Sequence, residues 1–373
     1  MTATTVDIPL FSLKGQQAAI GAEVKAAVAR VLDSGVYILG PENKAFDVEF
    51  ASAVGAKFCL GVDSGTSALE LAYEAAGVGP GDEVIVPSFT FIATATAVSK
   101  LGAIPVFADV DPITLTLDAK SVEKALTPKT KAIVPVHIYG QPADMDPLIT
   151  LAKSRKLVLI EDCAQAHLAT YKGRLVGSIG DLGAFSFYPS KNLGAAGDAG
   201  AVTMNDEKLR DAVNELRNCG RSAAAGYNHV RVGHNCRMDE VQAAVLRVKL
   251  LRLKAWTAAR RRVAAQYNDG LAGLPLRLPS LGADGTAGVF HLYTVRGDRR
   301  DALAAHLRAA GIASGVYYPT PVPLQPAYAG RAKHGPLPVT EAASREALSL
   351  PMFPELPSAD VARVIDAVRS FFK

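Results

Sequence analysis

Short apolar segments alternate with amphipathic ones through the first two thirds of this 373-residue chain, and this alternation limits the fold more than any other feature. Strands are expected at 58–62, 83–86, 104–109, 131–137, 157–161, 184–187 and 201–204. Helical patterns at 67–76, 92–100 and 146–156 lie between several of them. Because continuous apolar strands that alternate with helices indicate a sheet covered on both faces, the sequence predicts an α/β fold with a mostly parallel sheet.

The pattern changes after a long amphipathic helix expected at 239–267, whose apolar stripe includes Val241, Val248 and Leu251. Its many basic residues, including Arg260, are interpreted as a solvated face and not as a nucleic-acid site. Shorter elements follow, with a strand at 291–296, a helix at 301–310 and a proline-rich loop at 318–326. We therefore expect a large domain, residues 1–254, and a smaller C-terminal α/β domain, residues 255–373.

Composition argues against several classes of protein. The formal charge of +4 is mild, and without a long run of like charges it does not suggest nucleic-acid binding. No apolar stretch is long enough to span a membrane, and the first residues lack the pattern of a secretory signal. The four scattered cysteines match no zinc spacing, so we expect reduced thiols, no metal site and a cytoplasmic location.

Polar side chains follow several predicted strands, and in open α/β sheets ligands bind at the carboxyl ends of strands. Gly65 and Thr66 form a turn before a helix and could cradle a phosphate, although Ser64 could simply cap that helix. Glu161 and Asp162 end an apolar strand, where a carboxylate must meet a cation or cap a nearby loop.

Lys191 has an unusual position, between a strand-like segment that ends near Ser186 and a tract rich in glycine. A lysine that is partly desolvated there has a lowered pKa and can act as an amine nucleophile, although pairing with an acid is the commoner arrangement. Phe89 also follows a strand and could be core or could present its face to a ring. A phosphate turn, an acid, a lysine and an aromatic face together are what pyridoxal 5'-phosphate (PLP) requires.

Longer motifs resemble the DegT/DnrJ/EryC1/StrS family of sugar aminotransferases. They include PSFTFIATA, VPVHIYGQPADM, EDCAQAH, FSFYPSKNLGAAGDAG and GHNCRMDEVQAA, and they extend over almost the whole chain. The resemblance implies the fold of type I PLP-dependent transferases, which is that of aspartate aminotransferase. It also implies ping-pong transfer of an amino group from L-glutamate to a keto sugar, in a homodimer with composite active sites.

The same resemblance implies a role for individual residues. Lys191 would form the Schiff base with PLP, Asp162 would meet the pyridine nitrogen, and Gln165 would contact the phenolic oxygen. Phe89 would stack on the cofactor ring. Gly65, Thr66 and Ser186 would bind the phosphate, and Asn235 would reach the phosphate from the neighbouring subunit.

The motifs HIYGQPADM and EDCAQAH are closest to members that aminate C3 of a keto-6-deoxy sugar linked to dTDP or a similar nucleotide. A C4-directed or a cyclitol aminotransferase, a PLP-dependent sugar dehydratase and a non-catalytic regulatory protein are the alternatives. Many sugar-nucleotide members carry a lysine just before the tyrosine at 227, where this chain has Gly226. The substrate contacts are therefore expected from Arg221, Tyr227, His229 and Tyr318.

Overall fold

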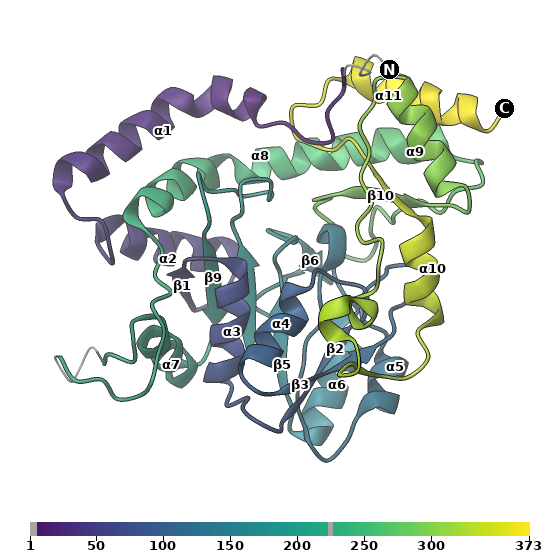
Figure 1. Ribbon diagram of the computed structural model, residues 1–373. Helices are drawn as coiled ribbons and strands as arrows, with labels where there is room; N and C mark the ends of the chain where they lie inside the picture. Colours follow the sequence, from purple (N-terminus) through teal and green to yellow (C-terminus); the bar gives the residue numbers. More distant parts are fainter. Residues whose placement is uncertain (1–5, 223–226) are drawn as a thin grey trace.

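The largest unit of the computed structural model, which describes residues 6–222 and 227–373, is an eight-stranded sheet (Figure 1). Its strands are β1 (Phe58–Val62), β2 (Glu83–Pro87), β3 (Ile104–Ala108), β4 (Thr130–Ile133), β5 (Val158–Asp162), β8 (Leu182–Ser186), β9 (Gly200–Met204) and β11 (Lys333–His334). Their order is β1-β9-β8-β5-β4-β2-β3-β11. Only β9 runs against its neighbours in this sheet, so the mostly parallel α/β fold is confirmed.

Helices cover both faces of this sheet. One face packs against α2 (Pro41–Val54), α5 (Ala119–Ala125), α6 (Met145–Arg155) and α8 (Glu240–Leu271). The other packs against α3 (Gly65–Ala75), α4 (Ala93–Lys100) and α7 (Glu207–Arg217). Aromatic rings fill the first layer, as where Phe50 of α2 meets Phe185 of β8 edge to face with centroids 5.0 Å apart.

The predicted strands agree with the structure, apart from small shifts at their ends and one clear difference. The strand expected at 131–137 ends earlier, because β4 stops at Ile133. Pro135 has no N–H to donate to a neighbouring strand, and Val136 makes only an isolated bridge to Asp162. Residues 134–140 therefore leave the strand and pass the end of β5, where the N–H of His137 donates to the carbonyl oxygen of Asp162.

A second sheet lies in the C-terminal part of the chain, where β10 (Tyr293–Arg296) pairs antiparallel with β12 (Ala347–Leu350). It shares a core with α9 (Arg300–Ala309), α11 (Ser358–Phe371) and the end of α8. The predicted division between residues 254 and 255 falls inside α8 and stays a prediction.

The remaining elements connect these units. Figure 1 shows α1 (Lys14–Ser34) lying along α8 at the top of the molecule. The others are η1 (Ile138–Gly140), β6 (Thr170–Tyr171), β7 (Arg174–Leu175), η2 (Val322–Leu324), η3 (Pro326–Tyr328) and α10 (Pro338–Glu346). In the described part of the chain, no helix has the length and apolar character needed to cross a membrane.

The apolar stripe predicted for α8 is only partly confirmed: Val241 and Val248 pack against a buried cluster with Ala27 and Val31 of α1, but Leu251 does not. Leu251 is 81% exposed, whereas Leu246 and Leu253 are buried against the large sheet. The solvated face predicted around Arg260 is also wrong at that residue, which is buried and donates hydrogen bonds to the carbonyl oxygens of Phe290, His291 and Met352. Because α8 passes from the large sheet to the second one, its buried face changes along its length and no single stripe describes it.

Candidate active site

The carboxyl ends of β1, β2, β5 and β8 lie at one edge of the large sheet, because these four strands run in the same direction. Gly65 follows β1, residues 88–92 follow β2, and Asp162 and Ser186 end β5 and β8. Lys191 lies five residues beyond Ser186. The polar residues that follow separate strands in the sequence therefore lie at one edge of the sheet in the structure.

The turn between β1 and α3 has the geometry of an anion site. The Ser64 hydroxyl caps the helix by accepting a hydrogen bond from the N–H of Ser67 at 3.1 Å. The first N–H groups of a helix, here those of Gly65 and Thr66, have no partner within it and carry its positive dipole end. A Cβ on Gly65 would lie 2.5 Å from the Cβ of Ser186, so only glycine fits and the Ser186 side chain adjoins the same turn. A phosphate group fits this combination of donors.

Asp162 supplies a buried carboxylate at the end of β5. It accepts hydrogen bonds from the Thr94 hydroxyl at 2.8 Å and from the N–H of Ala164 at 3.1 Å. Burial raises the pKa of this carboxyl above its ordinary value, and the two hydrogen bonds and the Lys191 ammonium oppose that rise. A cationic group bound here would favour the ionised carboxylate. Sequence reasoning missed Thr94, although it lies in the same motif as Phe89.

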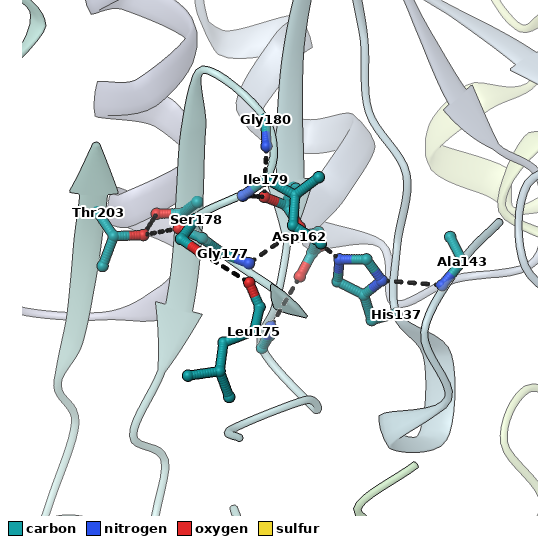
Figure 2. A network of polar contacts seen from close by, with 12 residues as sticks. His137, Ala143, Asp162, Leu175, Gly177, Ser178, Ile179, Gly180 and Thr203 are labelled. Atoms are coloured by element: carbon teal, nitrogen blue, oxygen red, sulfur yellow. Dashed lines mark hydrogen bonds and ion pairs between the residues drawn. The ribbon is translucent and has the colours of Figure 1, made fainter. Parts of the chain in front are cut away.

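Glu161, the neighbouring acid, holds a loop and not a ligand. Its fully buried carboxylate accepts hydrogen bonds from the N–H groups of Gly177, Ile179 and Gly180, at 2.9, 2.8 and 2.7 Å. His137 adds a fourth contact at 3.0 Å (Figure 2). For Glu161, the alternative in which a strand-end carboxylate caps a loop is therefore correct.

His137 belongs to the group of side chains, with Glu161 and Cys163, that is spaced to hold a metal ion among the described residues. Hydrogen bonds already use the ligand atoms of two of them. The N–H of Ala143 donates to Nδ1 of His137 at 3.0 Å (Figure 2). Nε2 therefore carries the proton and donates to Glu161. Burial also raises the pKa of the Cys163 thiol well above its ordinary value, which disfavours the thiolate that binds metals. This cluster is therefore a hydrogen-bonded support behind Asp162.

Lys191 is partly buried in the loop that follows β8, and its backbone N–H donates to the carbonyl oxygen of Tyr188 at 2.8 Å. Burial lowers the pKa of its ammonium group to about 8, against the opposing effect of the Asp162 carboxylate. A larger fraction of neutral amine near neutral pH makes this lysine a usable nucleophile. The lowered pKa agrees with the desolvated position expected from the sequence.

The aromatic groups near Asp162 differ from the expectation. Phe89 is only 1% exposed, with its ring centroid 6.3 Å from that of Tyr139 and 6.2 Å from that of Tyr318. This burial does not suit the stacking role expected of Phe89. Phe91 is 54% exposed, and its carbonyl oxygen accepts a hydrogen bond from the same Thr94 hydroxyl that contacts Asp162. Phe91 is therefore the better candidate for covering a bound ring.

Gln165 and Tyr318 contact each other close to the aromatic residues Phe89 and Tyr139. The Gln165 carbonyl accepts a hydrogen bond from the N–H of Tyr139 at 2.5 Å, and its amide nitrogen donates to the Tyr318 hydroxyl at 3.2 Å. Burial raises the pKa of Tyr318, so its hydroxyl keeps its proton at neutral pH. Tyr318 is the predicted substrate residue that this protomer places next to the cofactor residues.

The other predicted substrate residues lie between α7 and α8, where the described residues 218–222 and 227–239 extend away from the body of the molecule (Figure 1). Tyr227 is exposed, with the Arg221 guanidinium 4.7 Å from its ring centroid and the His229 ring 5.8 Å away. Asn235, at the end of this segment, is exposed as well. Gly226 lies outside the described residues.

Comparisons with known proteins agree with this geometry. Residues 18–369 match the model of the DegT/DnrJ/EryC1/StrS aminotransferase family. The chain is 50% identical over 371 residues to the dTDP-3-amino-3,4,6-trideoxy-alpha-D-glucose transaminase of Streptomyces venezuelae, covering 99% of this chain and 97% of that one. It is 46% identical over 369 residues to the UDP-N-acetyl-3-dehydro-alpha-D-glucosamine 3-aminotransferase of Acidithiobacillus ferrooxidans, covering 99% of each. The crystal structure of S. venezuelae DesV in complex with a ketimine intermediate has a TM-score of 0.95, 50% sequence identity and 98% coverage of both chains.

Proposed function

The chain belongs to the DegT/DnrJ/EryC1/StrS aminotransferase family, and from this premise we propose that it transfers the amino group of L-glutamate to C3 of a nucleotide-linked keto-6-deoxy sugar. The family consists of PLP-dependent aminotransferases of fold type I, so this protein is an enzyme of that class. One observation carries the proposal: a phosphate turn, a buried carboxylate and a lysine with a lowered pKa meet at one edge of the sheet.

The residues at this edge fit PLP. Its phosphate would bind the N–H groups of Gly65 and Thr66 together with the Ser186 hydroxyl, which lies against the same turn. Asp162 would face the pyridine nitrogen, whose positive charge offsets the cost of burying this carboxylate. When bound, PLP supplies an electron sink that lets a carbon next to the amine lose a proton.

The side chains around this position can then orient the reactants and move protons. Nζ of Lys191, with a pKa of about 8, can accept the proton from Cα of the amino donor and deliver it to another carbon. Thr94 holds the Asp162 carboxylate in a fixed orientation. Tyr318 keeps its hydroxyl proton and can donate it in a hydrogen bond to an oxygen of the sugar.

Two observations support C3 as the acceptor position and dTDP as the nucleotide. The names of both relatives described above specify amination at carbon 3 of the sugar. The more similar of these two acts on a dTDP-linked sugar. C4-directed and cyclitol aminotransferases are the alternatives that the experiment below separates from this proposal.

We propose that the active sites are composite and that the enzyme works as a homodimer. The exposed segment that carries Asn235 would reach the phosphate of the partner's cofactor, and Arg221, Tyr227 and His229 would face the partner's substrate. An apolar group of exposed side chains supports an interface, because monomers rarely expose such clusters: Leu32, Val36, Tyr37 and Ile38. A cytoplasmic location is supported by the free thiols of all four cysteines.

The test is to incubate the PLP-loaded enzyme with L-glutamate and a panel of keto acceptors. The panel contains dTDP-linked 3-keto and 4-keto 6-deoxy sugars, a UDP-linked 3-keto sugar and a keto cyclitol, and NMR locates the new amine. We expect an amine at C3 of the dTDP-linked sugar and none with Lys191→Ala. Amination only at C4, or only of the cyclitol, would replace the proposed substrate. Failure of glutamate to release 2-oxoglutarate with every acceptor would contradict the proposed donor.

A further inference from the structure

We propose that Asn192 is a positioning residue: it fastens the loop that carries Lys191 to the backbone of Val289, and so sets where the lysine amine lies. The inference rests on the proposed role of Lys191 in holding the cofactor. It concerns the geometry of that lysine and not the identity of the substrate.

The first observation is the environment of the Asn192 side chain. Asn192 directly follows Lys191 and is only 3% exposed. Its Nδ2 donates a hydrogen bond to the carbonyl oxygen of Val289 at 3.0 Å. Its Oδ1 is buried and has no hydrogen-bond partner among the described residues. An amide that is buried with its oxygen unpaired is costly, so this position is not explained by packing alone.

The second observation is that Val289, which accepts this bond, is itself held by Gly140 of η1. The N–H of Val289 donates to the carbonyl oxygen of Gly140 at 3.0 Å. Gly140 has φ of +88°, and a Cβ on it would lie 2.8 Å from Cγ2 of Val289 and 2.9 Å from the carbonyl oxygen of Gln165. Such a close approach leaves Val289 little room to shift relative to the cofactor residue Gln165.

Helix α8 holds the same segment, residues 288–291, from another direction. Arg261 donates from Nε to the carbonyl oxygen of Gly288 at 2.9 Å. Arg260 donates from one guanidinium nitrogen to the carbonyl oxygens of Phe290 and His291, at 3.2 and 3.4 Å. Val289 is therefore an anchor fixed by two different parts of the molecule.

The third observation is how the Lys191 loop is otherwise tied. Before the lysine, the Phe187 ring packs against Phe46 and Phe50, and the hydrogen bond nearest to the lysine is local, from the N–H of Lys191 to the carbonyl oxygen of Tyr188. After it, Lys249 of α8 donates to the carbonyl oxygen of Gly194 at 2.6 Å. Among the residues that the structure describes, Asn192 provides the side-chain hydrogen bond nearest to Lys191 that joins the loop to a distant segment. Loss of this bond would let the lysine move while the rest of the loop stays in place.

The test separates the position of the lysine from the integrity of the site. Apoprotein of the wild type and of Asn192→Leu, which keeps the branched shape of asparagine without its hydrogen bonds, is mixed with PLP. Borohydride traps the adduct at intervals, and peptide mass spectrometry gives the rate of labelling at Lys191. Binding of pyridoxamine phosphate, which has no aldehyde and cannot react with lysine, reports the phosphate and ring contacts alone. We expect labelling to be slower by about tenfold or more, since misplacement of a reacting group by about 1 Å has effects of that size or larger. We expect the affinity for pyridoxamine phosphate to stay within about twofold of the wild type.

Asn268→Leu is the matched control, because Asn268 also donates from Nδ2 to a backbone carbonyl, that of Pro279 at 3.1 Å, away from the sheet edge. It should lose this bond and the one that Oδ1 of Asn268 accepts from the Tyr293 hydroxyl at 2.8 Å, and still keep the wild-type labelling rate. Asn192→Ala removes the same donor as Asn192→Leu with a smaller side chain, and it provides the measurement if the leucine variant does not fold. Labelling at the wild-type rate in the Asn192 variants would overturn the inference. A parallel fall in labelling and in pyridoxamine phosphate affinity would overturn it too, because the asparagine would then support the whole site. Labelling of the wild type at another lysine would instead refute the proposed role of Lys191.

Discussion

Replacing Lys191 with methionine should change how the stability of the apoprotein depends on pH. Burial lowers the pKa of the folded Lys191 ammonium from 10.5 to about 8. The unfolded chain therefore keeps this proton up to about pH 10.5, whereas the folded protein releases it near pH 8. Between these values the unfolded state binds more protons, so this group makes the folded state more stable as pH rises.

The magnitude follows from the size of the shift. The difference between 10.5 and about 8 is about 2.5 pKa units. At 1.36 kcal/mol per unit, this corresponds to a gain of up to about 3 kcal/mol across the interval. The gain is present in full above the unfolded pKa and is lost as pH falls through the folded one.

The assay is urea unfolding of the wild-type and Lys191→Met apoproteins at several pH values from 7 to 10.5. Taking the difference between the two unfolding free energies removes the titration of all other groups, including the buried tyrosines. We expect this difference to shift by up to about 3 kcal/mol in favour of the wild type as pH rises. Lys25→Met, on an exposed position of α1, controls for the loss of a lysine. A difference that stays flat, or that moves in the opposite direction, would refute the desolvated environment assigned to Lys191.

Three further predictions concern the cofactor and the assembly. Asp162→Asn should slow turnover by about a hundredfold or more, because a charge at contact distance in a buried site is lost; steady-state rates within about threefold of wild type would contradict its role. Phe91→Ala should weaken pyridoxamine phosphate binding with little loss of stability, whereas Phe89→Ala should cost about 3–5 kcal/mol of unfolding free energy; titration and urea unfolding measure both, and the reverse pattern would restore Phe89 as the stacking residue. Lys191→Ala and Asn235→Asp, each inactive alone, should recover about half of the wild-type activity per mixed dimer, because one of its two sites carries neither change; no recovery after proven subunit exchange would show that Asn235 acts within its own chain or not at all.

Much of the fold could be predicted from the sequence because each strand is a short apolar run between turn signals. β1 agrees with its prediction at both ends, and the helix expected at 67–76 is α3 with a small shift. The long helix was placed correctly, but its contacts were predicted only in part, since they depend on separate cores that meet α8 at different points.

The candidate site shows where sequence reasoning stops. Glu161 and Asp162 are adjacent acids, and successive strand side chains point to opposite faces, so one must face away from a ligand at this edge. The sequence could not tell which, because the answer depends on the loop at 177–180 that Glu161 binds. For Phe89 and Phe91, which lie in one motif, the sequence likewise could not tell which ring faces the ligand. The packing of Phe89 against Tyr139, and of both rings near Tyr318, favours Phe91, through contacts far apart in the sequence.

The residue that PLP labels tests the central claim most directly. The purified enzyme is loaded with PLP, reduced with borohydride and digested, and mass spectrometry locates the modified lysine. We predict a single modified peptide that contains Lys191, together with loss of the yellow colour of the cofactor adduct in Lys191→Ala. Stoichiometric label on a different lysine, with Lys191 unmodified, would contradict the account of this site.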